Sequence, residues 1–201
     1  MTSTNKSRAR GRPRRFDAQQ AVATAQALFH EHGYDAVSVA DVTTTLGINP
    51  PSFYAAFDSK AGLFARVLDR WSVTGAIPFA AILRDGRPVA EALAELLEEA
   101  ARRYSADPGA TGCLVIEGTR SNDPQARDAA LACNRAAEEA IRAYVAARHP
   151  QDAERITDFV STMMSGLSAK ARTGHHLDQL LETARIASSA LSLALAVPPG
   201  G

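Results

Sequence analysis

The most constraining feature of this sequence is a short helical segment that is closed by a glycine and followed at once by another short helix. Ser38 and Asp41, three residues apart, form the pattern of a capping box, and Gly47 ends the helix that this box opens. Asn49 and Pro50 then suit the N-cap and the first position of the next helix. The two segments predict a helix-turn-helix, whose second helix lies in the major groove of DNA.

The rest of the chain is also predicted to be helical. Apolar residues recur at helical spacing, and no stretch of useful length alternates as a β-strand does. A helix is expected over residues 16–33 before the pair, and a connecting helix over 58–86 after it, weakened near Gly75 and Pro78. Further helices are expected at 88–106, 113–120, 124–148, 152–173 and 177–196. The fold class is therefore all-α, with a domain boundary inside the connecting helix, between residues 58 and 75.

Positive charge is concentrated in an N-terminal arm. The whole chain has 22 basic and 22 acidic side chains, yet residues 1–15 contain no acidic residue. The basic residues of this arm are Lys6, Arg8, Arg10, Arg12, Arg14 and Arg15. Such a block either binds a polyanion or is a solvated tail. Its arginines and proline could lie in a narrow A·T-rich minor groove or make only nonspecific phosphate contacts.

Composition excludes several classes of protein. No apolar run reaches the roughly 18 residues of a membrane helix, and the first fifteen residues are too polar for a signal peptide, so no membrane partner and a cytoplasmic location are expected. Neither cysteine has a metal-ligand spacing, so no metal or other cofactor is expected. The best case for an enzyme is the His175-His176 pair with Asp178, but these residues lie between helices and no catalytic motif accompanies them. No catalytic residue is therefore expected.

One stretch carries a family resemblance. The sequence VSVADVTTTLGINPPSFYAAFDSKAGLFARVL closely resembles the DNA-binding signature of the TetR family of transcriptional regulators, and the preceding RGRPRRFD resembles an arm that some members carry. The resemblance is specific over residues 12–68; GCLVIEG, SNDP and GLSAKARTG are similar, more loosely, to effector-domain landmarks of one branch. It implies a repressor that binds double-stranded operator DNA as a homodimer and is released by an unknown small molecule or an electrophile.

The resemblance also implies a division of labour along the chain. We expect a basic arm at 1–15, an N-terminal three-helix DNA-binding domain at 16–60, and an effector-binding and dimerisation domain at 61–201. Residues at 152–196 are expected to form the homodimer interface, because the last two helices carry apolar stripes dotted with small residues. Leu181 and Leu191 are members of these stripes. The same stripes could instead be ordinary intrachain core.

The family's DNA contacts carry over by position. Tyr54 and Lys60 match residues that commonly contact phosphate, although Tyr54 could instead pack against the first helix. Pro50, Pro51, Ser52 and Ala55 lie where family members face base edges. The full set of expected DNA-binding residues is Arg12, Arg14, Arg15, Ser38, Asn49, Pro50, Pro51, Ser52, Tyr54, Ala55 and Lys60. Residues 50–57 contain no Arg, Lys, Gln or Asn, so we expect weak base discrimination by this helix and more reliance on the arm and on DNA shape.

A ligand pocket is expected among the middle helices, as in the family. Aromatic and methionine side chains suit an apolar pocket, although plain core packing explains each of them too. The tentative lining residues are Trp71, Phe79, Tyr104, Cys113, Ile116, Phe159 and Met163. A helix N-terminus at Cys113 could lower the pKa of its thiol and make it a sensor of oxidants or electrophiles, or the residue could be a buried hydrophobe. Cys133 fits an apolar helical series and is expected in the core.

Overall fold

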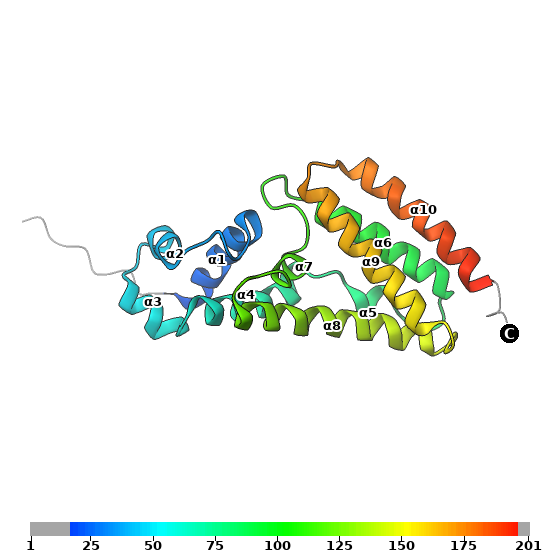
Figure 1. Ribbon diagram of the computed structural model, residues 1–201, viewed down its shortest axis with the longest axis horizontal. Helices are drawn as coiled ribbons and strands as arrows, with labels where there is room; N and C mark the ends of the chain where they lie inside the picture. Colours follow the sequence, from blue (N-terminus) through cyan, green and yellow to red (C-terminus); the bar gives the residue numbers. More distant parts are fainter. Residues whose placement is uncertain (1–16, 197–201) are drawn as a thin grey trace, which may run out of the picture.

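The computed structural model describes residues 17–196, which form ten α-helices and no β-strand in that range (Figure 1). The helices are α1 (Ala18–His32), α2 (Val39–Leu46), α3 (Pro50–Phe57), α4 (Lys60–Thr74), α5 (Phe79–Ile82), α6 (Val89–Tyr104), α7 (Leu114–Gly118), α8 (Pro124–Ala146), α9 (Ala153–Arg172) and α10 (Leu177–Ala196). The predicted all-α fold class is confirmed. No helix in the described range is both long and apolar enough to cross a membrane.

Local capping groups begin the first helices, as the sequence predicts. The Asp41 backbone N–H donates to Ser38 Oγ at 3.1 Å, and the Ser38 N–H donates to the Asp41 carboxylate at 2.8 Å, which completes the capping box of α2. Gly47 ends α2 with a φ of 64°, a left-handed conformation that glycine adopts without strain. Asn49 Oδ1 accepts from the Ser52 N–H at 2.9 Å and opens α3. Short-range hydrogen bonds therefore fix the turn between α2 and α3.

The connecting helix is shorter than predicted. It was expected to continue to residue 86, but α4 ends at Thr74 and only the four-residue α5 follows before the α6 helix. The Trp71 indole lies against the backbone of Gly75, where a Cβ would come within 2.5 Å of the ring. Pro78 has no N–H to continue a helical ladder. The chain therefore turns away at Gly75 and leaves α5 as a separate element.

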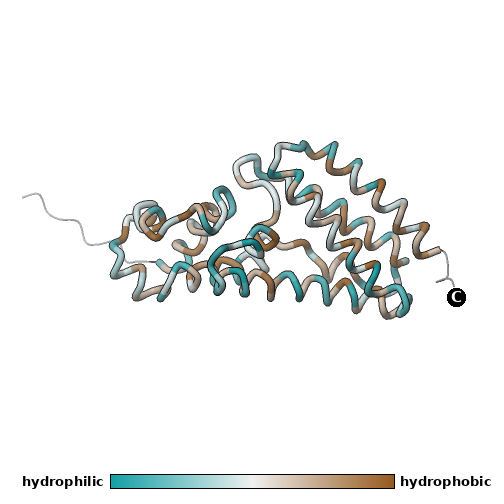
Figure 2. Tube along the Cα trace, in the orientation of Figure 1, coloured by the Kyte–Doolittle hydropathy of each residue, from teal (hydrophilic) through white to brown (hydrophobic). Residues whose placement is uncertain are grey.

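Two apolar cores hold the helices together. The first core joins α1–α4 to Leu114 of α7 and to Ala126 and Ala130 of α8, so it continues past the expected boundary at residue 60. The second core joins α5, α6, α8, α9 and α10. In Figure 1, α8 runs along the lower edge from α4 and α7 to the end of the C-terminal bundle, and Figure 2 shows hydrophobic and hydrophilic segments alternating along each long helix. The α8 helix thus links the helix-turn-helix to the C-terminal bundle.

Candidate DNA-binding surface and ligand cavity

The α3 helix separates a buried face from an exposed one. Phe53 and Phe57 are fully buried in the first core, and the centres of their rings lie 5.5 Å apart. Pro51, Ser52 and Ala55 are exposed, and Tyr54 is 50% exposed with its ring edge-on to Phe53. The expected groove-facing residues therefore lie together on the outer surface of α3. The Tyr54 side chain lies on this outer face and not in the core beneath α1.

Two of the expected DNA contacts also have structural roles. The Ser38 hydroxyl donates to the Asp41 carboxylate at 2.6 Å and accepts from the Asp41 N–H, so the capping box uses both functions of this hydroxyl. The hydrogen bonds that the Asp41 carboxylate accepts from the Ser38 hydroxyl and backbone N–H hold the pKa of Asp41 below its usual value. Asn49 uses its carbonyl oxygen as the α3 cap, while Pro50 is exposed beside it. Asn49 therefore keeps only its amide N–H groups for DNA.

Lys60 lies at the first position of α4, and its ammonium is turned into the protein. Its Nζ donates to the backbone carbonyls of Tyr34 at 3.0 Å and Val37 at 2.9 Å, and lies 3.9 Å from the centre of the Tyr34 ring. Partial burial lowers the pKa of Lys60 despite the nearby Asp35 and Asp123. The ammonium thus ties the α1–α2 loop to α4, and only its third proton is left for a phosphate. Arg12, Arg14 and Arg15 lie outside the described residues.

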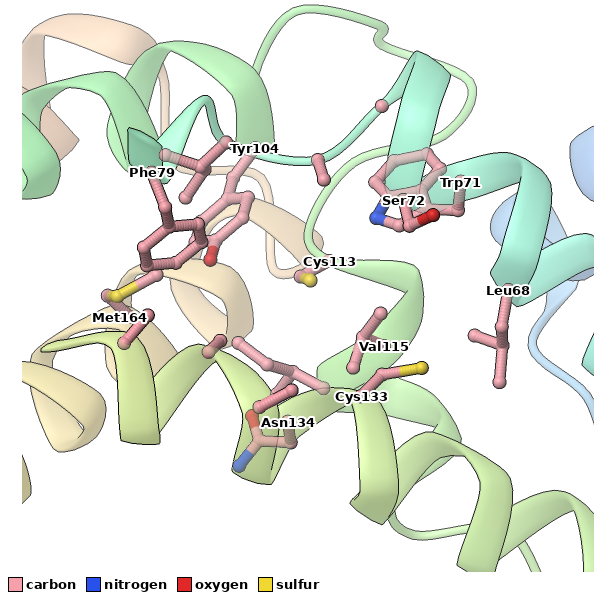
Figure 3. Close-up of a pocket in the computed structure, with 17 residues that line it drawn as sticks. Leu68, Trp71, Ser72, Phe79, Tyr104, Cys113, Val115, Cys133, Asn134 and Met164 are labelled. Carbon is pink, nitrogen blue, oxygen red and sulfur yellow. The ribbon is translucent and has the colours of Figure 1, made fainter. Parts of the chain in front are cut away.

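A cavity of ≈ 290 Å³ opens between the cores (Figure 3). Trp71 of α4 lies at one end, Phe79 and Tyr104 at the other, and Cys113 between them. The complete lining is Leu68, Trp71, Ser72, Gly75, Ala76, Ile77, Phe79, Tyr104, Cys113, Val115, Ile116, Cys133, Asn134, Ala136, Ala137, Ala140 and Met164. The sequence prediction for Trp71, Phe79, Tyr104, Cys113 and Ile116 thus agrees with the cavity wall.

Two predicted lining residues are not in the cavity wall. Phe159 and Met163 are partly buried against the second core, and it is Met164, one position along α9, that reaches the cavity. One residue is about 100° of helix rotation, enough to change the face that a side chain occupies. Cys133, expected in the core, also lines the wall. The alanine-rich face of α8 escaped prediction because small side chains give no positive signal for a pocket.

Of the two alternatives for Cys113, a reactive thiol and a buried hydrophobe, the electrostatic setting favours the second. Cys113 is the N-cap of α7, and its backbone N–H donates to Ser168 Oγ at 2.9 Å. The helix N-terminus does not lower the thiol pKa, because burial dominates and raises the pKa of Cys113 above its usual value. Burial likewise raises the pKa of Tyr104, whose hydroxyl bonds to this thiol. Both groups are therefore neutral near pH 7.

A polar cluster joins the end of α1 to the cavity wall. His30 Nε2 donates to the Gly112 carbonyl at 3.0 Å. The His30 ring packs edge-on against the Trp71 indole, with the ring centres 4.8 Å apart. Arg172 of α9 donates to the carbonyls of His30 at 3.1 Å and Thr111 at 2.9 Å. We call His30, Trp71, Gly112 and Arg172 the interdomain cluster. Arg172 falls within the GLSAKARTG stretch, but its partners are distant in sequence and no local pattern indicates them.

A second polar link lies nearer the helix-turn-helix. The Tyr34 hydroxyl donates to the Asp123 carboxylate at 2.6 Å, and the Asn122 N–H donates to the carboxylate of Asp35 at 3.0 Å. The Tyr34 bond is the largest influence that keeps the pKa of Asp123 below its usual value. Asn122 and Asp123 belong to the SNDP stretch, and Asp123 also caps α8. The loop after α1 is thus bonded to the start of α8.

The apolar stripes of α9 and α10 lie mostly inside the chain. Leu191 is buried and Leu181 is partly buried against the second core, so replacing them would damage the chain's own core. The exposed large apolar residues of α10 are instead Leu177, Ile186 and Leu193. The last two are seven positions apart and share one helix face.

In the described range, no cluster of three or more His, Cys, Asp or Glu side chains could hold a metal ion.

Residues 21–67 match the family model described as bacterial regulatory proteins, tetR family. The chain is 59% identical over 195 residues to the HTH-type transcriptional repressor BdcR of Escherichia coli K12, covering 97% of this chain and 99% of BdcR. It is 30% identical over 188 residues to the HTH-type transcriptional repressor ComR of the same strain, covering 88% of this chain and 90% of ComR.

Solved structures share the fold. A cysteine-substituted CifR, a TetR family transcriptional regulator complexed with 26-bp double-strand operator DNA, superimposes with a TM-score of 0.79 at 33% identity, covering 89% of this chain and 99% of CifR. Reduced NemR of E. coli superimposes with a TM-score of 0.69 at 14% identity, covering 87% of this chain and 94% of NemR. The likeness thus spans the helix-turn-helix and the C-terminal bundle together.

Proposed function

Because this chain belongs to the TetR family of transcriptional regulators, we propose that it is a repressor that binds operator DNA as a homodimer and releases it when a small molecule fills the cavity. The observation that carries the proposal is α3, whose Ser52, Tyr54 and Ala55 face outward while Phe53 and Phe57 anchor it. CifR, at 33% identity, has been solved with operator DNA, which supports the same use of this surface.

The proposed DNA contacts divide into two kinds. Tyr54 and the third proton of Lys60 contact phosphates, which position the protein without reading bases. The Ser52 hydroxyl is the best-placed base reader, and the Asn49 amide is a second one. Pro50, Pro51 and Ala55 contribute apolar contacts to thymine methyl groups. Ser38 supports this surface mainly through its capping box. Arg12, Arg14 and Arg15 of the arm add positive charge close to the DNA.

We propose that the dimer forms through α9 and α10, within residues 152–196. Ile186 is 65% exposed and Leu193 is 71% exposed on one face of α10. On α9, a Cβ at Gly166 would meet nothing within 4 Å in the single chain, so this position offers room for a partner helix to approach. Ile186→Glu with Leu193→Glu should give monomers by sedimentation, whereas Val73→Glu, at an 86% exposed apolar residue of α4 outside the proposed interface, tests added charge alone.

Coupling between the cavity and the DNA is proposed to run through the interdomain cluster. Trp71 lines the cavity and contacts His30 of α1, and Cys113 of the cavity wall follows Gly112, which accepts the His30 hydrogen bond. A ligand that displaces either wall residue therefore strains contacts to the DNA-binding domain directly. The raised pKa of the Cys113 thiol favours reversible binding over electrophile chemistry as the trigger.

Electrophoretic mobility of DNA taken from upstream of the neighbouring genes tests the proposal. A repressor of this kind forms a discrete complex that survives excess random DNA. Ser52→Ala should weaken binding to the operator more than to random DNA, and Tyr54→Phe should weaken both alike. A wild-type protein that binds no upstream fragment in preference to random DNA would contradict the proposed function.

A further inference from the structure

The cavity wall is uncharged throughout. None of its seventeen lining residues is an Asp, Glu, Lys, Arg or His. Three lining groups could ionise in principle, but burial raises the pKa of the Cys113 thiol, the Cys133 thiol and the Tyr104 phenol, so each is neutral near pH 7. A charged ligand would lose its water here and gain no counter-charge, which is strongly unfavourable.

The size of the cavity limits the ligand further. An apolar protein cavity of about 150 Å³ holds one benzene ring. The volume here is ≈ 290 Å³, which is room for two fused rings or an aliphatic molecule of similar bulk. Ala136, Ala137 and Ala140 of α8 contribute small side chains to the wall, and the Trp71 and Phe79 rings lie toward its two ends. Flat aromatic ligands suit a wall that contains aromatic rings.

The cavity wall has few polar groups. The Asn134 amide donates one proton to the Glu138 carboxylate at 2.9 Å, and that bond leaves its second proton and its carbonyl oxygen for another partner. Glu138 is itself engaged by the Ser161 hydroxyl at 2.6 Å and is not part of the wall. The Ser72 hydroxyl donates to the Asp69 carbonyl of its own helix at 2.7 Å. Asn134 is therefore the side chain best able to orient a ligand.

We infer that the effector is an uncharged, largely apolar molecule of about two fused rings that carries one small neutral hydrogen-bonding group, which Asn134 recognises. The inference rests on the proposed function only in calling this ligand an effector. The neutral wall, the volume and the single orienting amide hold for any molecule that enters the cavity.

Three probes of one ring system test the inference by calorimetry on the free protein. At pH 7, 2-naphthamide is neutral, 2-naphthoate is an anion and 2-naphthylmethylamine is a cation. We expect 2-naphthamide to bind at least about tenfold more tightly than either charged probe, because only the charged probes lose ionic hydration. Equal or tighter binding of a charged probe inside the cavity, or no binding of the amide, would overturn the inference.

Variants locate the binding. Ala137→Phe places a ring in the cavity and should reduce 2-naphthamide affinity at least about tenfold. The control Ala132→Phe, at an exposed alanine of α8 outside the lining, should leave the affinity within about twofold. Ala140→Phe at the exposed rim is a second filling variant, and circular dichroism checks that each variant folds. Amide binding that survives both filling variants would place the probe elsewhere and overturn the inference. Tight amide binding without release of operator DNA would instead contradict the proposed function.

Discussion

The two ends of α4 are held in opposite ways. At its first turn, the Lys60 ammonium bonds to two backbone carbonyls of the α1–α2 loop, and Phe64 is fully buried between Phe29 and Tyr34. At its last turn, Val73 is 86% exposed, and Trp71 lies between the cavity and His30. The first end of α4 is thus part of the first core, and the last turn borders the cavity.

This difference indicates how a ligand would act. The Trp71 indole is held by packing and by its ring contact with His30, whereas hydrogen bonds and a packed aromatic core tie the Lys60 end to the α1–α2 loop. We therefore expect a ligand that shifts the last turn of α4 to reorient the DNA-binding domain without unfolding it. Variants at the two ends of α4 test this contrast.

The largest effect is expected at the buried part of α4. Phe64→Ala should lower the free energy of unfolding by about 3–5 kcal/mol, because it removes a ring from a packed core and leaves a cavity. Val73→Ala at the exposed end should change it by no more than about 0.5 kcal/mol. Chemical denaturation measures both. Similar losses for the two variants would contradict the contrast between the ends.

Lys60→Met should have the next largest effect. It keeps the aliphatic stem but removes the ammonium that bonds to the Tyr34 and Val37 carbonyls, with an expected loss of about 1–3 kcal/mol in unfolding free energy. Lys170→Met, at an exposed lysine of α9, is the matched control and should have little effect. If denaturation shows no difference between the two variants, the Lys60 end is not anchored as described.

A methyl group at Gly75 should disturb the opposite end. The Cβ of Gly75→Ala would lie within 2.8 Å of three Trp71 ring atoms, so the indole must shift. Trp71 is the only tryptophan in the chain, so its fluorescence reports this shift directly. We expect a net loss of about 1 kcal/mol, since overpacking against the indole outweighs the smaller conformational freedom of alanine in the unfolded chain. An unchanged emission spectrum would mean that the indole does not rest on Gly75.

Gly166→Ala is the matched control for that variant. A Cβ at Gly166 would meet nothing within 4 Å, so the single chain should gain up to about 1 kcal/mol from the better helix former. A weaker dimer in sedimentation would locate the partner helix at this face of α9.

The smallest expected effect is a pH dependence from His30. Burial lowers the pKa of His30 below its usual value of 6.5; the hydrogen bond to the Gly112 carbonyl and the nearby Asp107 oppose this shift, and Arg172 adds to it. Above pH 6.5 the imidazole is neutral in both the folded and unfolded chains. As the pH falls below 6.5, the unfolded chain binds a proton that the folded chain does not, so stability decreases until the pH reaches the folded pKa.

The difference between wild type and His30→Gln isolates this effect. Denaturation between pH 7.5 and 5 should show a steeper loss of stability for wild type than for His30→Gln, whose side chain has no proton to gain. His176→Gln, at an exposed histidine, should follow wild type. A His30→Gln profile as steep as that of wild type would show that His30 is protonated equally in both states.

Sequence reasoning succeeded where the determining contacts are local. The caps at Ser38 and Asn49 and the left-handed Gly47 each depend on residues within four positions, and the spacing alone revealed them. Sequence reasoning failed for features that depend on packing between residues distant in the sequence. Met164 lies in the cavity instead of Met163 because of the rotation of α9 against α6 and α8, which no periodicity of one helix specifies.

Two further features depend on burial and distance. A short helix start at Cys113 predicts a lowered thiol pKa, but the surrounding fold buries the thiol and reverses the direction. Arg172 and His30 are 142 positions apart, so their hydrogen bond could not be anticipated from spacing. The end of α4 was indicated by Gly75 and Pro78 as a weak point, but the packing of Trp71 on Gly75 makes it a complete break.

The most direct test of the proposed coupling is whether a saturating concentration of a cavity ligand weakens the binding of operator DNA. With 2-naphthamide as the ligand, operator affinity of the wild type should fall at least about tenfold, an effect of the size typical of coupled sites. His30→Leu removes the hydrogen bond to the Gly112 carbonyl and the ring contact with Trp71, and His30 is not part of the cavity wall. This variant should bind 2-naphthamide normally, yet adding 2-naphthamide should change its operator affinity less than about twofold. A roughly tenfold release of operator DNA from His30→Leu as well would show that the signal does not pass through the interdomain cluster.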